Sequence, residues 1–142
     1  MAVGLRKVLA GGKAGTWGPI LTGIFGMGII LAGLFATDPA FGFPLGTPNT
    51  MPTTMSTHAM VHSIGFYTAF IALIAACFVL ARRFSIEKDS IWTWFSVVIG
   101  VVTPVLIALG MSVLSGLAGL CFAIAGILSM GWLSATAWRL RK

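Results

Sequence analysis

The sequence predicts an all-α integral membrane protein, a helical bundle with four transmembrane helices and both termini in the cytoplasm. Hydrophobic residues make up 58% of the chain and charged residues 8%, whereas a soluble domain carries roughly a quarter charged residues. Charged side chains are absent from three long stretches, 14–37, 39–81 and 90–138. All nine Lys and Arg residues fall outside these stretches. A surface so poor in charge is expected to face lipid, so the lipid bilayer is the first predicted partner.

The first two spans are predicted from the first two charge-free stretches. A helix needs about 20 residues to cross about 30 Å of hydrocarbon. Residues 17–36 form the first predicted span, after a cytoplasmic segment at 1–16. Prolines at 39, 44, 48 and 52 predict a loop on the outer side at 37–56, because proline interrupts regular helices. The second span is predicted at 57–81, where Thr54, Ser56 or Thr57 can cap its first turn.

The third charge-free stretch is too long for one span. As one helix, residues 90–138 would reach about 73 Å, more than twice the hydrocarbon thickness. The weakest helix-forming segment in it is MSVLSG at 111–116. We therefore predict spans at 91–111 and 115–138, with a cytoplasmic loop at 82–90 and a cytoplasmic tail at 139–142.

The basic residues predict the orientation. Cytoplasmic loops of membrane proteins are enriched in Lys and Arg, and this span assignment puts all nine on one side. Three short clusters separated by apolar runs do not form one basic face, so nucleic acid is not an expected partner despite a net charge of +6. The basic residues expected to anchor the topology after the second and fourth spans are Arg82, Arg83, Arg139, Arg141 and Lys142.

Two stripes of small residues suggest close contact between helices. Small side chains four residues apart allow helix backbones to approach each other. Ser115, Gly119 and Ala123 form one such stripe, and Ala72 and Ala76 form a shorter one. The partner helix can belong to the same chain or to another copy in a homo-oligomer. The alternative is that Gly and Ala are simply common in membrane helices.

Three ionisable residues stand out on the predicted outer side. Asp38 ends the first span, while His58 and His62 begin the second. Their i, i+4 spacing puts both imidazoles on one helix face, where they can share a divalent metal ion. Asp38 can complete such a site, orient an imidazole or pair with a protonated one. The tentative metal ligands are therefore Asp38, His58 and His62.

The same residues also have structural explanations. Asp38 before Pro39 is a favourable turn residue, and histidines at a span end lie in the polar headgroup zone. Three alternatives therefore stand: a structural polar cluster without a cofactor, a metal or substrate site, and no interaction at all. The zinc-protease motif is excluded, because Ala59 stands where that motif needs Glu. The catalytic motifs GxSxG and GxxxxGK[ST] are absent from the sequence.

Several of these features together resemble a known family. They are the sequence FATDP at 35–39, the loop rich in Gly, Pro and Thr, the HxxxH helix start and the run ACFVLARRF at 76–84. The chain is similar here to the domain of unknown function 998 family of bacterial and archaeal multi-span membrane proteins. That resemblance implies a prokaryotic plasma (inner) membrane protein in which Asp38, His58 and His62 recur as a set. The chain departs from the family pattern at Ala59, because Gly is usual at that position in the family.

The resemblance also implies a longer design. Members of the family usually have about six spans, so this chain would lack the first two, and residues 2–7 would be the inner end of the second. Two functions are considered. The first is a non-enzymatic bundle that binds a partner, a lipid or a small solute. The second is a metal-dependent membrane enzyme with an outward-facing Asp38–His58–His62 site acting on a lipid or ester.

Overall fold

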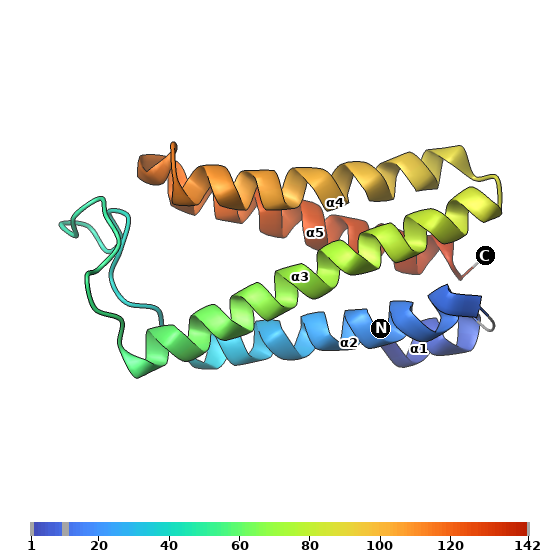
Figure 1. Ribbon diagram of the computed structural model, residues 1–142, viewed down its shortest axis with the longest axis horizontal. Helices are drawn as coiled ribbons and strands as arrows, with labels where there is room; N and C mark the ends of the chain where they lie inside the picture. Colours follow the sequence, from blue (N-terminus) through green and yellow to red (C-terminus); the bar gives the residue numbers. More distant parts are fainter. Residues whose placement is uncertain (1, 10–11, 142) are drawn as a thin grey trace.

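Over the part of the chain that the structure describes, the protein is built from helices and has no β-strand. A computed structural model describes residues 2–9 and 12–141, and Figure 1 shows its helices lying roughly along one long axis. Within these residues the predicted all-α class is confirmed, whereas the orientation stays a prediction. The elements are α1 (Ala2–Val8), α2 (Gly12–Leu34), α3 (Thr57–Ile86), α4 (Ser90–Met111), the 3₁₀ turn η1 (Ser115–Leu117) and α5 (Ala118–Arg139).

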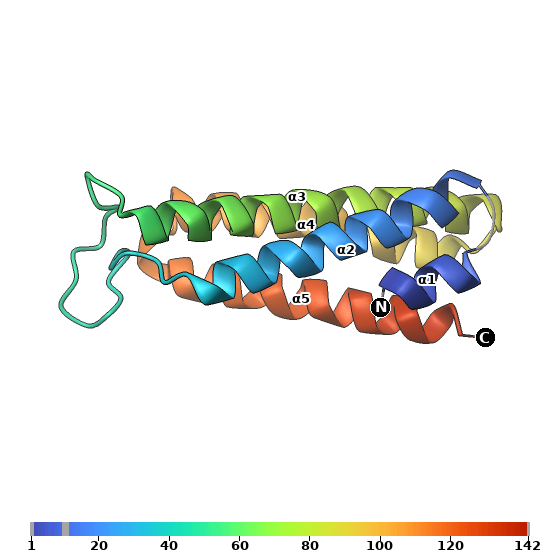
Figure 2. The same cartoon turned by 90° about the horizontal axis from the view of Figure 1, so that it is seen from below.

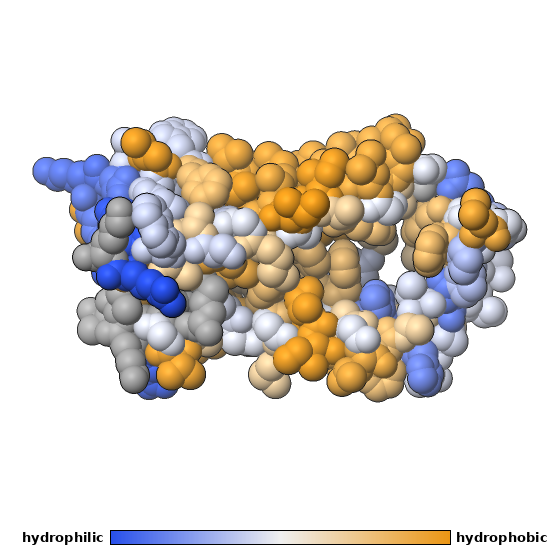
Figure 3. Space-filling model, turned by 180° about the vertical axis from the view of Figure 1, so that it is seen from behind, coloured by the Kyte–Doolittle hydropathy of each residue, from blue (hydrophilic) through white to orange (hydrophobic). Residues whose placement is uncertain are grey.

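Four of these helices are long and apolar enough to cross a membrane. The spans are Ala14–Leu34, Thr57–Ile86, Ser90–Met111 and Ala118–Arg139. Figure 3 shows the apolar surface lying mainly between more hydrophilic ends. Helix α3 has 30 residues and is about 45 Å long, which exceeds the hydrocarbon thickness of about 30 Å. It runs obliquely across the others (Figure 1), as a long span does when it tilts.

The N-terminal segment forms a helix of its own before the first span. Residues 2–8 form α1, and α2 begins at Gly12 rather than at residue 17, so Pro19 lies inside the helix. Helix α1 folds back beside α2 (Figures 1 and 2). Leu9 is fully buried, and a side chain added at Gly18 would meet it at 3.2 Å. Burial of this leucine explains why the segment packs as a helix on α2.

The pair α2–α3 is held together by direct backbone contact. A Cβ atom at Gly28 would lie 2.6 Å from the Gly65 carbonyl oxygen, and one at Gly65 would lie 2.8 Å from the Gly28 carbonyl oxygen. Glycine has no side chain, so the two helices cross here at the closest possible distance. Further along α3, Ala72 and Ala76 are buried in the core.

The pair α4–α5 is held together by polar side chains as well as by packing. The Trp132 indole N–H of α5 donates to the Ser96 hydroxyl of α4 at 3.0 Å, and both residues are buried. Arg139 pairs with Asp89 at 2.9 Å, which joins the end of α5 to the start of α4. Near the opposite end, the Cβ position of Gly110 faces the Cβ of Cys121 at 2.9 Å.

The predicted small-residue stripe of the last span lies away from this contact. Gly119 and Ala123 are exposed, and within the described residues nothing lies within 4 Å of a Cβ built at Gly119. The side chain of Ser115 lies outside the described part. Helix α5 instead turns the neighbouring face towards the core, with Ala118, Cys121, Ala125, Ser129, Trp132 and Thr136 buried. Contact at the Gly119 stripe therefore stays a prediction about another copy.

The two ends of the bundle differ in composition. The junction of α1 with α2 and the end of α5 lie at the end where α3 connects to α4, and the long loop lies at the opposite end (Figures 1 and 2). We call the first the basic end and the second the loop end. At the basic end Arg83 pairs with Glu87 at 2.8 Å, and Arg82 and Arg141 are exposed. Lys142 lies outside the described residues.

Candidate functional site

His62 joins the two helices that meet at the loop end. Its Nδ1 lies 2.8 Å from the Ala32 carbonyl oxygen and 3.0 Å from the Phe35 carbonyl oxygen. Carbonyl oxygens only accept hydrogen bonds, so Nδ1 carries the proton and donates it. The carbonyls at the end of α2 lack partners within their own helix. His62 therefore caps α2 from α3, and its Nε2 atom is left for other interactions.

Asp38 stabilises the start of α3. The backbone N–H of Ser56 donates to Asp38 Oδ2 at 2.7 Å, and Ser56 is the N-cap of α3, with its hydroxyl accepting from the Ala59 N–H at 3.1 Å. Hydrogen bonds from Ser56 hold the pKa of the Asp38 carboxyl below its ordinary value of 3.8, and the Ser56 side chain contributes more to this shift than its backbone N–H. Partial burial opposes this shift, and the charge of His58 adds to it.

His58 lies on the same face of α3 but makes a different contact. Its ring meets the Phe35 ring edge-on, with the centroids 5.4 Å apart. Phe35 thus contacts both histidines. Its ring packs against the His58 ring, and its carbonyl oxygen accepts a hydrogen bond from His62. The structure brings Asp38, His58 and His62 to one end of the α2–α3 pair. Within residues 2–9 and 12–141, however, no group of three His, Cys, Asp or Glu side chains is arranged to hold a metal ion.

A row of aromatic rings extends from this cluster to α5. His62 stacks on Phe66 with the rings nearly parallel at 13°, and Phe66 meets Phe122 of α5 with centroids 5.9 Å apart. His58 is exposed, and the other four residues of the row are half-buried, namely Phe35, His62, Phe66 and Phe122. The row therefore joins the end of α2 to α3 and α5 through ring contacts. We call Phe35, His58, His62, Phe66 and Phe122 the aromatic row.

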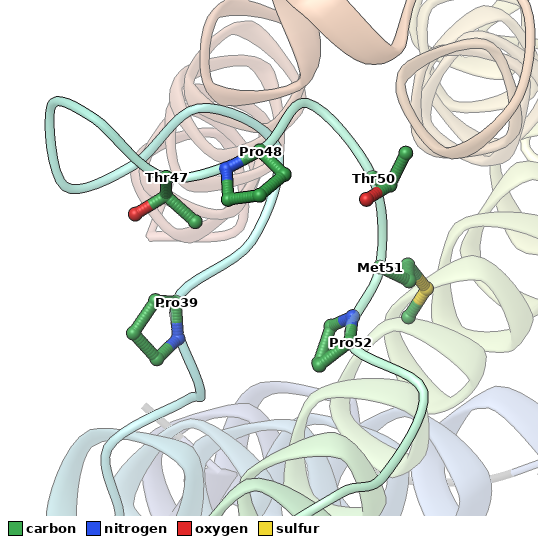
Figure 4. A pocket seen from close by; sticks show the side chains of 6 residues that line it. All are labelled: Pro39, Thr47, Pro48, Thr50, Met51 and Pro52. Carbon is green, nitrogen blue, oxygen red and sulfur yellow. The ribbon is translucent and has the colours of Figure 1, made fainter.

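The loop at 37–56 surrounds a hollow lined by its own residues. Backbone hydrogen bonds close the loop on itself, from Phe41 N–H to Thr50 O at 3.3 Å and from Gly42 N–H to Pro48 O at 3.2 Å. The hollow has a volume of about 390 Å³. Figure 4 shows its lining side chains around the space between the two arms of the loop. They are Pro39, Thr47, Pro48, Thr50, Met51 and Pro52.

The loop also reaches the second helix pair. The Asn49 side-chain nitrogen lies 3.0 Å from the Cβ position of Gly116, in the turn between α4 and α5. Figure 3 shows the molecule hollowed at this end, between the helices and the loop, with hydrophilic atoms at the edge of the opening. The loop thus spans both helix pairs above an open space.

The comparisons with known proteins place the chain in one family. Residues 1–139 match the family described as protein of unknown function (DUF998). The chain belongs to this DUF998 family. No curated protein and no solved structure matches it. Family membership and the four apolar spans show a membrane protein of uncharacterised function.

In this DUF998 protein, sequence reasoning selected Asp38, His58 and His62 but missed the rest of the site. Phe66 and Phe122 lie 56 positions apart in sequence, within apolar runs where aromatic residues are common. The spacing of Phe66 four residues after His62 was a usable signal, because that spacing puts both rings on one face of α3. The contact with Phe122 depends on how α5 packs and has no local signal.

Proposed function

We propose that the protein is a non-enzymatic membrane bundle that binds a lipid or a small solute at the loop end. In this proposal the basic end faces the cytoplasm of a prokaryotic cell, and the loop end faces outwards. The observation that carries the proposal is that the polar side chains of Asp38 and His62 are hydrogen-bonded to backbone groups at the loop end. Asp38 Oδ2 stabilises the start of α3, and His62 Nδ1 caps the end of α2. Both groups are thus engaged in holding the facing ends of α2 and α3.

The hollow and its surroundings support binding. Ligand pockets are concave and largely apolar, with a few polar groups that orient the ligand. Prolines and Met51 line the hollow together with two threonines. On the lipid side of the α2–α3 pair, a second groove of about 420 Å³ runs over Gly28 and Gly65. This groove is suited to an acyl chain, since all its lining residues except Thr68 are apolar.

A metal-dependent enzyme acting on a lipid or ester is the second candidate, favoured by one observation. Histidines that bind metal usually donate their other ring N–H to a carboxylate or a backbone carbonyl, which fixes the tautomer. His62 donates from Nδ1 to two carbonyls, so Nε2 has the form of a metal ligand. In this proposal His58 and Asp38 would supply the remaining ligands, and the bound water would attack the ester.

One experiment on the purified protein separates the two proposals. Native mass spectrometry in mild detergent identifies retained lipids and solutes, and elemental analysis quantifies zinc and iron. Retained lipid or solute without stoichiometric metal is expected for the binding protein. Stoichiometric metal that is lost in His62→Ala, while a thermal melt still shows a folded protein, would favour the enzyme. A preparation that carries neither ligand nor metal would contradict both.

The proposed orientation is tested separately. Basic residues concentrate on the cytoplasmic side of membrane proteins, so a reporter fused after residue 142 is expected to report cytoplasm. A reporter inserted at Gly46, at the exposed tip of the loop, is the matched control and is expected to report the opposite side. A periplasmic signal from the C-terminal fusion would overturn the orientation.

A further inference from the structure

The basic end carries an excess of positive charge that the protein itself does not neutralise. The chain has nine basic and three acidic residues. Of the acids, Asp38 lies at the loop end, while Glu87 pairs with Arg83 and Asp89 pairs with Arg139. Within residues 2–9 and 12–141, four exposed cations have no ion pair, namely Arg6, Arg82, Lys88 and Arg141. An anionic partner can therefore meet them.

Helix α1 places one of these cations beside an apolar span. It folds back along α2 (Figures 1 and 2), so that Leu9 lies 3.2 Å from the Cβ position of Gly18 and Ala2 lies 3.8 Å from that of Gly23. Both glycines lie inside the first span, about 6 Å and about 14 Å from its start at 1.5 Å per residue. Arg6 lies between these two contacts, and it is therefore level with the apolar part of α2 and not beyond its end.

An arginine at this depth requires an anion that belongs to the membrane. A guanidinium group cannot be deprotonated in proteins, and a charged side chain inside the hydrocarbon is costly unless it is paired or reaches the headgroup layer. Trp17, which is 52% exposed and precedes Gly18, marks this layer on α2 as an interfacial aromatic residue. Arg6 precedes Leu9 by three residues, about 4.5 Å along the helix, a distance that an arginine side chain spans when it extends along an apolar surface. Its guanidinium group can thus reach a lipid phosphate.

We propose that the basic end binds anionic phospholipids, with Arg6 of α1 as the residue that holds a lipid phosphate beside α2. Arg82, Lys88 and Arg141 add to the attraction for negative headgroups at the membrane surface. Charge complementarity selects an anionic headgroup over a zwitterionic one. The depth of Arg6 selects a lipid over a soluble acidic protein, which does not enter the apolar layer. This site lies at the opposite end from the proposed ligand-binding end and does not depend on it.

The test measures which of two phospholipids the protein retains. The full chain in non-ionic detergent is incubated with equal amounts of phosphatidylglycerol and phosphatidylethanolamine that carry the same acyl chains, and native mass spectrometry counts the bound lipids. We expect a preference for phosphatidylglycerol of about tenfold, since one basic residue near an anionic lipid surface contributes a factor of about five and the other exposed cations add a smaller factor. Equal retention of the two lipids, or a preference for phosphatidylethanolamine, would overturn the proposal.

Matched variants assign the phosphate to Arg6. Arg6→Gln removes the charge and is expected to reduce the preference for phosphatidylglycerol about fivefold, whereas Arg6→Lys keeps the charge and is expected to retain most of it. Thr16→Gln, at an exposed position in the first turns of α2, introduces the same side chain without removing a charge and is expected to leave the preference unchanged. Arg141→Gln, beyond the end of α5, is expected to cost less than Arg6→Gln. Equal losses in these last two variants would overturn the assignment to Arg6.

A thermal melt separates lost binding from lost folding. Arg6→Gln is expected to melt like the native protein in lipid-free detergent, while added phosphatidylglycerol raises the melting temperature of the native protein more, because a ligand stabilises the folded state that binds it. Equal stabilisation of both proteins by phosphatidylglycerol would contradict the proposal. The two proposed sites also fail separately. A ligand retained at the loop end in a protein without any preference for phosphatidylglycerol would refute this inference and uphold the proposed binding function.

Discussion

The two helix pairs of this bundle achieve close contact by different physical means. In α2–α3 the backbones touch at Gly28 and Gly65, and the polar contacts lie at the loop end. In α4–α5 a buried Trp132–Ser96 hydrogen bond and the Arg139–Asp89 ion pair hold the helices together towards the basic end. The pair that packs through glycine has its interhelical polar contacts at the loop end, whereas the other pair has them nearer the basic end.

The largest expected effect comes from removing the glycine contact between α2 and α3. Gly28→Ala places a methyl group 2.6 Å from the Gly65 carbonyl oxygen, so the helices must separate. We expect a loss of about 3 kcal/mol in the free energy of unfolding, measured by denaturant titration in detergent. Gly26→Ala on the same helix is the control, because nothing lies within 4 Å of its Cβ position. Equal stability of the two variants would show that the backbones do not touch.

The second pair is expected to lose less from its buried hydrogen bond. Ser96→Ala leaves the Trp132 indole N–H without its acceptor in a fully buried position. An unsatisfied buried donor costs about 1–3 kcal/mol, but in membranes such bonds average about 0.6 kcal/mol, so we expect about 1 kcal/mol. The same denaturant titration measures this loss in the free energy of unfolding, with Ser134→Ala on the exposed face of α5 as the control. A cost as large as that of Gly28→Ala would erase the contrast between the pairs.

The histidine cap of α2 is expected to contribute a smaller amount. His62→Phe keeps a ring to stack on Phe66 but removes the N–H that serves the Ala32 and Phe35 carbonyls. Water can replace the donor in part at this half-buried position, so we expect a loss of about 0.5 kcal/mol. His58→Phe, which removes no hydrogen bond that the structure records for His58, is expected to leave the thermal melting temperature unchanged. A lower melting temperature in both variants would indicate that the hydrogen bonds of His62 are not what stabilises this end of the bundle.

The smallest expected effect is the pH dependence due to Asp38. Its pKa is lowered in the folded protein, so its contribution to stability is present above the ordinary value of 3.8 and is lost as the pH falls through the lowered value. Between about pH 5 and about pH 2.5, the melting temperature of the native protein is expected to fall more than that of Asp38→Asn. Parallel curves for the two proteins would show that the Ser56–Asp38 contact adds no stability.

The fold class could be predicted because it depends on composition along the chain. A long apolar run without charges is stable in lipid, and a backbone in lipid must satisfy its hydrogen bonds within a helix. The limits of α4 are close to the predicted span at 91–111 for this reason. The packing of the N-terminal segment was not predicted, because the burial of Leu9 depends on a space beside Gly18 that no local pattern indicates.

The candidate site could be predicted only in part. Asp38, His58 and His62 are conspicuous in a sequence with so few ionisable groups, and their spacing places the histidines on one helix face. The sequence left open whether they bind a metal or each other. The structure shows Asp38 and His62 bonded to backbone groups of the facing helix ends. Such contacts depend on the position of the partner backbone, which no side-chain pattern encodes.

By itself, the sequence determined that this chain is a four-span helical membrane protein with its basic residues gathered towards one end. Hydropathy and charge act locally and leave a direct trace in the order of residues. Only the tertiary structure decided which glycines touch, which face of α5 is buried and which aromatic rings form a row from Phe35 to Phe122. These contacts join residues far apart in the chain, and they depend on how the helices cross.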